Sequence, residues 1–395
     1  MRIVYFTHSL RSCWNHGNAH FLRGVLRELI GRGHAVTAYE PEGAWSLQNL
    51  LSDHGPDGLD AWQRAYPELS SLTFGPDADL AALTDGADLV IVHEWNEPEL
   101  IAAIGRLRAA GATFLLLFHD THHRAVSAPE EMQRFDLSAY DGVLAFGETL
   151  SDVYRRWGWK NVFTWHEAAD LRLFHPPAEE QERRGLVWIG NWGDGERTAE
   201  LETFLLGPAA QAGLPLDIYG VRYPPEALAL LERYGVQYRG WIANARAPQV
   251  FARALATVHV PRRFYTQMLP GIPTIRVFEA LACGIPLLSA PWEDSEHLFR
   301  PGQDFLFARD SAEMTRHLRA LAADPDLRRT LVQSGLETIR ARHSCAHRAE
   351  ELLDIVAQLR PLSEKVSSPP SPTLSPDQPS AGHPLPRGER DKEVA

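Results

Sequence analysis

The stretch that decides the fold is "RIVYFTHSLRSCWNHGNAHFLRGVLRELIGRGHAVTAY", from Arg2 to Tyr39. It begins with an apolar run over Arg2–Phe6, and four apolar residues then share one helical face: Leu22, Val25, Leu26 and Leu29. The glycines of "GRGH" end this helix, and a second apolar run covers Ala35–Tyr39. Strand, helix, glycine turn and strand in this order predict a βαβ unit of a parallel, doubly wound sheet.

The same alternation continues along the chain. In the N-terminal half we expect four further strands: Leu89–Val92, Thr113–Phe118, Gly142–Ala145 and Val162–Trp165. A second series of strands, again separated by helical patterns, covers Leu186–Ile189, Leu216–Tyr219, Val236–Tyr238, Val258–Val260 and Pro286–Leu288. We therefore predict an α/β fold of two tandem Rossmann-like, doubly wound domains that face each other across a cleft. Such sheets bind ligands at the carboxyl ends of their strands.

Changes in composition predict the domain boundaries. The polar, proline-rich stretch "HPPAEEQERR" lies between the two series of strands. We expect an N-terminal domain over residues 1–175, a linker over 176–184 and a C-terminal domain over 185–345. A helical pattern runs from Ser311 to Leu359 and includes a last helix over 346–360. Residues 361–395 are rich in Pro and Ser and poor in bulky apolar residues, so we expect a disordered tail.

Composition excludes some classes of protein. The chain has 395 residues, 44% of them hydrophobic, and a net charge of −12, which argues against a nucleic-acid groove. The longest apolar run in the N-terminal half, "FLLLF", is too short to span a bilayer, so no integral membrane segment is expected. Cys13, Cys283 and Cys345 form neither a disulfide framework nor a CxxC pair, which favours a reducing cytoplasm.

A carboxylate inside an apolar unit needs an explanation. "TIRVFEALACGIPLLSAPW", from Thr274 to Trp292, reads as a helix, a glycine stop and a buried strand, with Glu279 inside the helix. Thr274 is a plausible N-cap, and free amides at such a helix start favour a phosphate. A nucleotide there would bring its ribose hydroxyls within reach of Glu279. The alternative is that Glu279 forms a salt bridge, for example with Arg276.

Polar residues follow other predicted strands. Arg197, in "GNWGDGERT", comes after a Gly-rich strand end, where amides and a guanidinium can both face a diphosphate. Two buried strands end in titratable residues: His93 and Glu94 in "VHEWNEP", and His119, Asp120 and His122 in "FHDTHHR". These groups could form a metal site, a polar cap on the strands or a sugar-binding site at the cleft. We favour the sugar-binding site and expect no metal.

Five stretches resemble, in matching order, retaining glycosyltransferases with the two-domain B-type fold, as in glycosyltransferase family 4. They are "HSLRSCWNHGNAHFLRGVLRELIGRGHAV", "LLLFHDTHH", "WHEAADLRLFHP", "VWIGNWGDGER" and "TIRVFEALACGIPLLSAPW". The set is most similar to the CgeB-like spore-maturation branch, and the resemblance covers roughly Met1 to Leu359.

This resemblance implies roles for single residues. His119 matches the histidine that contacts the donor sugar beside the reacting carbon, and Arg197 the basic residue that neutralises the leaving diphosphate. Glu279 matches the ribose-binding carboxylate. Gly17 would let the first loop approach the phosphates or the acceptor, and Trp241 lies where relatives wrap a loop around the base.

The donor motif departs from the family at one position. The pattern E-x7-E expects an acidic residue eight before Glu279, and this chain has Gly271 there. In relatives that first carboxylate lies near the donor sugar, so the identity of the sugar stays open. Gly271, Ile272 and Thr274 are still expected at the donor, in the loop before the helix.

These features predict an enzyme that transfers a sugar from a nucleotide-sugar to an acceptor hydroxyl with retention. UDP is favoured as the nucleotide and GDP is the alternative; no tightly bound cofactor is expected. The acceptor is a glycan, a lipid-linked molecule or a protein. Alternatives are a nucleotide-sugar epimerase on the same fold and a catalytically degenerate sugar- or nucleotide-binding protein. A pyridoxal phosphate enzyme is disfavoured because Lys160 is the only lysine before the tail.

Overall fold

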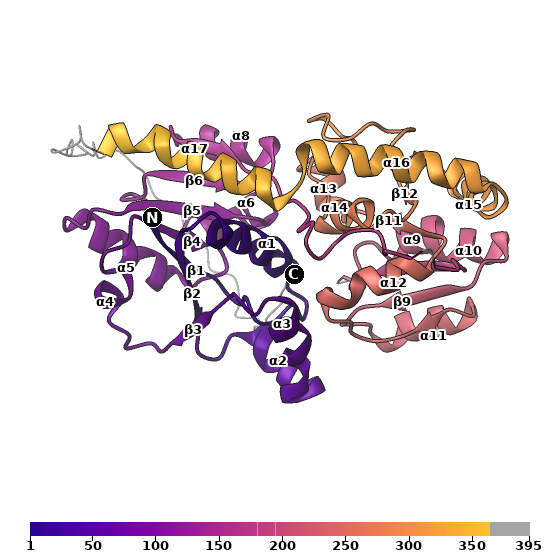
Figure 1. Ribbon diagram of the computed structural model, residues 1–395, viewed down its shortest axis with the longest axis horizontal. Helices are drawn as coiled ribbons and strands as arrows, with labels where there is room; N and C mark the ends of the chain where they lie inside the picture. Colours follow the sequence, from indigo (N-terminus) through magenta and orange to yellow (C-terminus); the bar gives the residue numbers. More distant parts are fainter. Residues whose placement is uncertain (180, 194, 364–395) are drawn as a thin grey trace, which may run out of the picture.

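The computed structural model describes residues 1–179, 181–193 and 195–363, which form two α/β domains side by side (Figure 1). The N-terminal domain holds a seven-stranded sheet in the order β3-β2-β1-β4-β5-β6-β7. The other domain holds a six-stranded sheet in the order β10-β9-β8-β11-β12-β13. Every strand pairing is parallel, and helices connect the strands. The expected fold of two Rossmann-like domains is therefore confirmed.

The strands lie close to their expected positions. In the N-terminal sheet they are β1 Arg2–Phe6, β2 Ala35–Pro41, β3 Ser71–Phe74, β4 Leu89–His93, β5 Leu115–Asp120, β6 Gly142–Ala145 and β7 Val162–Thr164. In the C-terminal sheet they are β8 Leu186–Ile189, β9 Leu216–Tyr219, β10 Gln237–Tyr238, β11 Ala256–His259, β12 Leu287–Ser289 and β13 Leu306–Phe307. Only β3 and β13 were not expected. Both are short edge strands, and Leu72 in β3 is half exposed, so neither gives a strong hydrophobic pattern.

Helices cover both faces of each sheet. The N-terminal domain contains α1 Asn18–Gly31, α2 Trp45–His54, η1 Pro56–Leu59, α3 Asp60–Ala65, α4 Leu80–Thr84, α5 Pro98–Ala109, α6 Arg124–Ser127, α7 Pro129–Met132 and α8 Glu148–Arg156. The C-terminal domain contains α9 Thr198–Leu201, η2 Glu202–Leu206, α10 Gly207–Ala212, α11 Pro225–Arg233, η3 Asn244–Arg246, α12 Ala247–Arg253, α13 Arg263–Gln267, α14 Ile275–Ala282, α15 Ser311–Ala323 and α16 Pro325–Arg342. No helix in the described ranges is long and apolar enough to cross a bilayer.

The last helix, α17 (Cys345–Ser363), returns to the N-terminal domain, where it packs against α1 (yellow in Figure 1). Its buried residues repeat at helical spacing: Cys345, Ala349, Leu352, Ile355, Val356 and Leu359. They belong to the same apolar core as Phe21 and Val25 of α1. Of the predicted disordered tail, residues 361–363 belong to this helix, and the rest lies outside the described residues.

The chain thus crosses between the domains twice, and the two crossings touch. Ala169, on the first crossing, forms a parallel bridge with Ser344 on the second. The Ala169 amide donates to the His343 carbonyl at 3.1 Å, and the Cys345 amide donates to the Ala169 carbonyl at 2.9 Å. The relative position of the two domains is therefore fixed at one edge by backbone hydrogen bonds.

Candidate functional site

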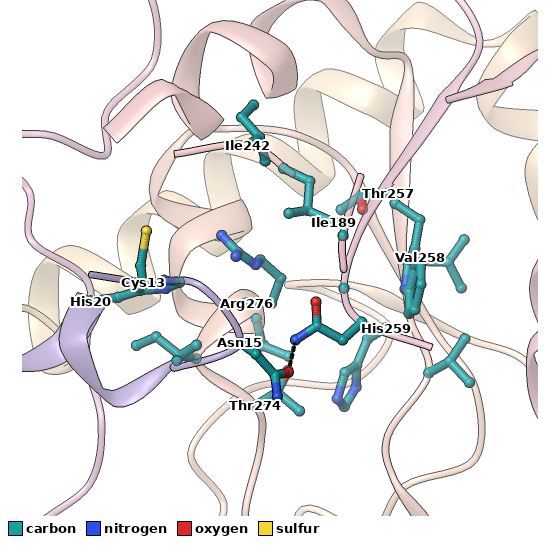
Figure 2. A pocket seen from close by; sticks show the side chains of 18 of the residues that line it. Cys13, Asn15, His20, Ile189, Ile242, Thr257, Val258, His259, Thr274 and Arg276 are labelled. Atoms are coloured by element: carbon teal, nitrogen blue, oxygen red, sulfur yellow. Dashed lines mark hydrogen bonds between the residues drawn. The ribbon is translucent and has the colours of Figure 1, made fainter. Parts of the chain in front are cut away.

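Two adjoining cavities lie between the domains. We call the first the Arg276 cavity; it measures about 180 Å³ and is lined by residues of both domains (Figure 2). The second, the Glu167 cavity, measures about 250 Å³. They share the lining residues Asn15, His16, Gly17, Asn191, Arg197, Thr274 and Ile275. Asn191 donates a hydrogen bond to Asn15 across the domain boundary, so the first loop and the start of the C-terminal domain meet here (Figure 2).

The first turn of α14 forms one wall of the Arg276 cavity. Thr274 occupies the expected N-cap position, but its side chain makes no capping hydrogen bond. Residues 274–277 all line the cavity, so the amides of this helix start lie beside open space. Free amides and the positive end of a helix dipole favour an anion at this position.

Gly17 brings the first loop against the same helix. A Cβ built at Gly17 would lie 3.8 Å from Ile275 Cγ2, which is an ordinary contact, and the backbone φ is −68°. The backbone does not require glycine at this position, and an approach of the loop to phosphates or to an acceptor stays a prediction. A larger side chain would instead take up cavity volume.

Arg197 lines both cavities and is held rigidly. Its Nη1 donates to the Val260 carbonyl at 2.9 Å, and its Nη2 donates to the Asn191 carbonyl at 2.6 Å. Its guanidinium lies 5.3 Å from the centre of the Trp188 ring. Burial, helped by the positive charge of Arg262, lowers the pKa of Arg197 to about 10, so the side chain stays cationic at neutral pH. A fixed buried cation suits a diphosphate.

Further arginines make the cleft cationic. Arg262 and Arg222 line the Glu167 cavity, and Arg276 lines the cavity named after it. Among the residues that line these two cavities, the one carboxylate is Glu167, in the Glu167 cavity. Arg276 is paired with Glu279 and Arg262 with Glu196, so the anion-binding character of the cleft depends mainly on Arg197 and the amides at the start of α14.

Glu279 lies beneath the Arg276 cavity and is only 1% exposed. Its Oε1 accepts from Asn244 Nδ2 at 2.9 Å and lies 3.2 Å from His20 Nδ1, and its Oε2 accepts from Arg276 Nη1 at 2.5 Å. Burial alone would raise the pKa of Glu279, but Arg276, His20 and Asn244 together lower it. These are the protein partners that the salt-bridge interpretation requires. Its ribose-binding role remains a prediction.

His119 does not lie where the sequence led us to expect it. Strand β5 continues to Asp120, two residues beyond its expected end, and His119 is fully buried against Phe21 of α1 and Trp165. Its Nδ1 is hydrogen-bonded to the Tyr5 hydroxyl, and its ring contacts Trp165 edge-on. It lines neither cavity.

The other titratable residues at these strand ends, His93, Glu94 and Asp120, are also fully buried. Glu94 Oε2 lies 2.7 Å from His93 Nε2, and both residues are fully buried. Asp120 accepts from the Tyr154 hydroxyl at 2.7 Å and from the His122 amide at 3.0 Å. Burial raises the pKa of Glu94 to about 8 and, together with the Glu94 charge, that of Asp120 to about 7. Within the described ranges no three His, Cys, Asp or Glu side chains gather to hold a metal ion.

His122 is the histidine of this loop that reaches the cleft. It lines the Glu167 cavity, and neither of its ring nitrogens has a hydrogen-bond partner among the described residues. Its ring lies 5.0 Å from that of Trp95. A histidine with both nitrogens available can bind hydroxyl groups of a ligand.

Of the other residues expected at the donor, Trp241 lines a cavity, whereas Gly271 and Ile272 do not. Trp241 lines the Arg276 cavity and lies 4.7 Å, centre to centre, from the His54 ring. Gly271 has φ +94°, and a Cβ there would lie 2.2 Å from Ser295 Oγ. Ile272 is buried against Gly147 of the N-terminal domain. Gly271 and Ile272 line neither cavity, so they position the loop rather than face a ligand.

A long groove in the N-terminal domain continues from the Glu167 cavity. It measures about 1060 Å³ and shares Asn15, Trp45, Trp95 and Arg222 with that cavity. We call it the indole groove because Trp14, Trp45 and Trp95 line it. Glu94 is the only one of the four strand-end residues His93, Glu94, His119 and Asp120 that lines it.

Sequence reasoning missed several cleft residues. Asn15 and His16 lie next to the predicted Gly17 in "NHGNAH", and Asn191 lies six residues before the predicted Arg197 in "GNWGDGER". Arg262 and Tyr265 belong to α13 and the turn before it, where no pattern marked them. Glu167 follows β7 in "WHEAAD", at the carboxyl end of a predicted strand, and that position was the available signal.

Comparisons with known proteins agree with this geometry. Residues 197–354 match the model of a family described as glycosyl transferase-like. The structure is similar to sucrose-phosphate synthase from Thermosynechococcus elongatus, with a TM-score of 0.61, 17% identity and coverage of 91% of this chain and 99% of the other. It is equally similar to Anabaena Alr3699/HepE in complex with UDP and glucose, with a TM-score of 0.61, 15% identity and coverage of 91% and 100%.

An alpha-glucosyltransferase in complex with UDP-glucose and DNA gives a TM-score of 0.64 at 14% identity, with coverage of 90% of this chain and 99% of the other. No curated protein matches the sequence. At these identities the structural likeness establishes the fold, over nearly the whole of the described chain. The chain therefore has the two-domain fold of the B-type glycosyltransferases, and its C-terminal part matches a glycosyl transferase-like family.

Proposed function

We propose that the protein is a glycosyltransferase that transfers a sugar from a nucleoside-diphosphate sugar to an acceptor hydroxyl, with retention of configuration. UDP is the favoured nucleotide, and we further infer a place near family 4 and its CgeB-like branch. The observation that carries the proposal is the position of Arg197, a buried fixed cation in the cleft beside the first turn of α14. Two features that favour an anion, the Arg197 guanidinium and the free amides at the start of α14, thus lie together between the domains.

The cavities suggest how the donor lies. Its base would occupy the Arg276 cavity beside Trp241 and Ile242. Its diphosphate would lie where the two cavities join, against the α14 amides and Arg197. The sugar would then extend into the Glu167 cavity. In the neighbours, UDP or UDP-glucose is bound by Alr3699/HepE and by the alpha-glucosyltransferase, which supports UDP here.

The reaction requires few catalytic side chains. The bond between the anomeric carbon and the diphosphate breaks, and its electron pair leaves with the diphosphate. The acceptor oxygen forms the new bond on the same face, and its proton passes to the departing phosphate oxygen. Arg197 and the α14 amides stabilise the charge that develops on the diphosphate. No protein nucleophile is required, which is compatible with a glycine at position 271 and a buried His119.

The indole groove is the proposed acceptor site, since it opens into the Glu167 cavity. Indole faces pack against sugar rings, and carboxylates accept from sugar hydroxyls. Carboxylates along the groove include Glu42, Glu97, Glu99 and Glu131. Arg124, Arg134 and Arg222 also line the groove, so its charge is mixed and it lacks the basic excess that a phosphate backbone requires. We therefore propose a glycan-bearing acceptor, free or carried by a lipid or protein, and no nucleic acid. A nucleotide-sugar epimerase would have no use for such a groove.

The test measures release of the nucleoside diphosphate, UDP or GDP, from a panel of UDP- and GDP-sugars, with and without oligosaccharide acceptors. We expect one nucleotide-sugar to be consumed and its sugar to appear on an acceptor with unchanged anomeric configuration by NMR. Conversion of the sugar without an acceptor would indicate an epimerase. Binding of UDP or GDP without turnover of any donor would indicate a degenerate binding protein, and absence of binding to both nucleotides would reject the proposed function altogether.

A further inference from the structure

We infer that Glu167 binds the hydroxyl groups of the donor sugar and thereby selects the sugar. This inference rests on the proposed function, because it needs a nucleotide-sugar in the cleft. Glu167 lies in the segment after β7, at the carboxyl end of the N-terminal sheet, and lines the Glu167 cavity from the side of that domain.

Glu167 is a buried carboxylate without a partner. The residue is 8% exposed, yet no hydrogen bond or ion pair reaches its carboxylate from residues 1–179, 181–193 or 195–363. The buried carboxylate of Glu279, by contrast, is bound through both oxygens by Arg276 and Asn244, whereas Glu94 accepts from Thr121 through one oxygen only. Leaving a buried polar group unpaired is costly, so a protein that keeps one beside a cavity has a use for it when a ligand fills that cavity.

The surroundings of Glu167 define which part of a ligand it meets. The same cavity is lined by Arg197 and Arg262, which suit the diphosphate, and by Thr274 at the start of α14. Glu167, His122 and Tyr265 line the same cavity. A group attached to the diphosphate and extending into this cavity would meet these three side chains. In a nucleotide-sugar that group is the sugar, and its hydroxyls are the donors that a carboxylate lacks.

No other carboxylate of the donor loop is available for this purpose. Position 271 is glycine, and a side chain there would collide with Ser295. Glu296 lies beside Gly271, but both of its oxygens are used. Its Oε1 accepts from the Glu148 amide at 2.9 Å, and its Oε2 lies 2.7 Å from His166 Nε2. Glu296 therefore links the two domains, while Glu167 stays available for a ligand.

The protonation state of Glu167 suits a hydroxyl-rich ligand. Burial, with the negative charges of Glu279 and Glu94, raises the pKa of Glu167 to about 8. Near neutral pH the group is therefore mostly a neutral acid, which can donate one hydrogen bond and accept others. Sugar hydroxyls both donate and accept, so they can satisfy it fully.

The experiment compares affinities for UDP, UDP-glucose and UDP-N-acetylglucosamine by calorimetry, in wild type and in Glu167→Ala. We expect the variant to bind UDP within about twofold of wild type and to bind the preferred UDP-sugar about tenfold more weakly, the effect of one or two lost hydrogen bonds. The melting temperature without ligand should not fall, because Glu167 has no partner to lose. Glu296→Ala is the matched control; it should lower the melting temperature and leave the ratio of the UDP to UDP-sugar dissociation constants unchanged.

The outcomes are distinguishable. If wild type binds UDP and a UDP-sugar, and Glu167→Ala changes both affinities equally or neither, the inference is overturned while the proposed function stands. A fall in the melting temperature of Glu167→Ala as large as that of Glu296→Ala, without a change in the ratio, would show a structural role. If wild type binds neither UDP nor a UDP-sugar, it is the proposed function that fails.

Discussion

Arg276 Nη1 lies 2.5 Å from Glu279 Oε2, one turn further along α14, and also donates to Asn244 Oδ1 at 2.9 Å. Asn244 Nδ2 in turn donates to the other oxygen of Glu279. The three side chains therefore form a closed network under the Arg276 cavity. Because Arg276 lines the cavity and Glu279 does not, Arg276 would have to move before a ribose could reach the carboxylate.

The first prediction concerns this network. Glu279→Gln should lower the free energy of unfolding of the unliganded protein by about 1–3 kcal/mol, because Arg276 loses a buried ionic partner. Thermal or urea unfolding measures this. The ribose-binding role is checked separately, by comparing UDP with 2′-deoxy-UDP in both proteins. If Glu279 contacts the ribose, wild type prefers UDP and the Gln variant prefers it less; equal preference in both proteins would reject that role.

Arg197→Ala should weaken UDP binding by about 1.5–3 kcal/mol, the range for a hydrogen bond to a charged group. It should also destabilise the unliganded protein, since the carbonyls of Val260 and Asn191 lose their donor. Calorimetry with UDP gives the first quantity and thermal unfolding the second. The control is Arg263→Ala, an exposed arginine paired with Glu200 that lines neither cavity. A loss of UDP affinity below about threefold in Arg197→Ala would contradict a diphosphate contact.

Stability should depend on pH with a maximum near pH 6.5. The pKa values of Glu94 and Asp120 are raised to about 8 and about 7, so the folded state holds protons that the unfolded state releases. Their contribution is complete below the ordinary carboxyl pKa and is lost as pH rises toward 8. Burial lowers the pKa values of His123 and His259 from 6.5 to about 3, so their contribution is present above pH 6.5 and is lost as pH falls.

Melting temperatures measured between pH 5 and pH 9 test this dependence. Glu94→Gln should flatten the decline above pH 6.5, because the amide has no proton to release. A melting temperature that rises steadily up to pH 9 would contradict the assignment of raised carboxyl pKa values to the folded state.

The packing of α17 gives a fourth prediction. Leu352 is fully buried against the N-terminal domain, so Leu352→Ala should cost about 2–5 kcal/mol of unfolding free energy. Leu353, its half-buried neighbour, serves as the control and should cost less on the same substitution. Truncation after Ser363 should leave UDP release unchanged, whereas truncation after Arg342 should unfold the N-terminal domain. Retained stability without α17 would show that the helix is dispensable.

Patterns along the chain predicted the central strands of both sheets because buried parallel strands are short apolar runs. They missed β3 and β13, where an edge position removes the need for a strong apolar pattern. They also ended β5 too early, since His119 and Asp120 look like loop residues but are buried through contacts with Tyr5 and Tyr154. Apolar periodicity contains no information on such pairs.

The site was predictable only as far as it follows from local structure. The start of α14 and the neighbourhood of Arg197 could be placed, because a glycine-rich strand end and a helix N-terminus are local features. The partners of Glu279 could not, since Asn244 lies 35 residues away in sequence and His20 in the other domain. The unpaired state of Glu167 is likewise visible only when its three-dimensional surroundings are known.

The hydrogen-bonded contact between Ala169 and the segment His343–Cys345 has a mechanical consequence. Two covalent connections that run side by side and are joined by backbone hydrogen bonds restrain twisting and sliding of the domains at this edge. A rotation about an axis through this contact would widen or narrow the cleft at its far side, where it would have to break contacts such as Asn191 to Asn15. Arg2 and Arg360, near the two ends of the described chain, both bind Asp88. The C-terminal domain is thus an insertion within the N-terminal one, and a circularly permuted chain that joins these ends should keep the same axis of rotation.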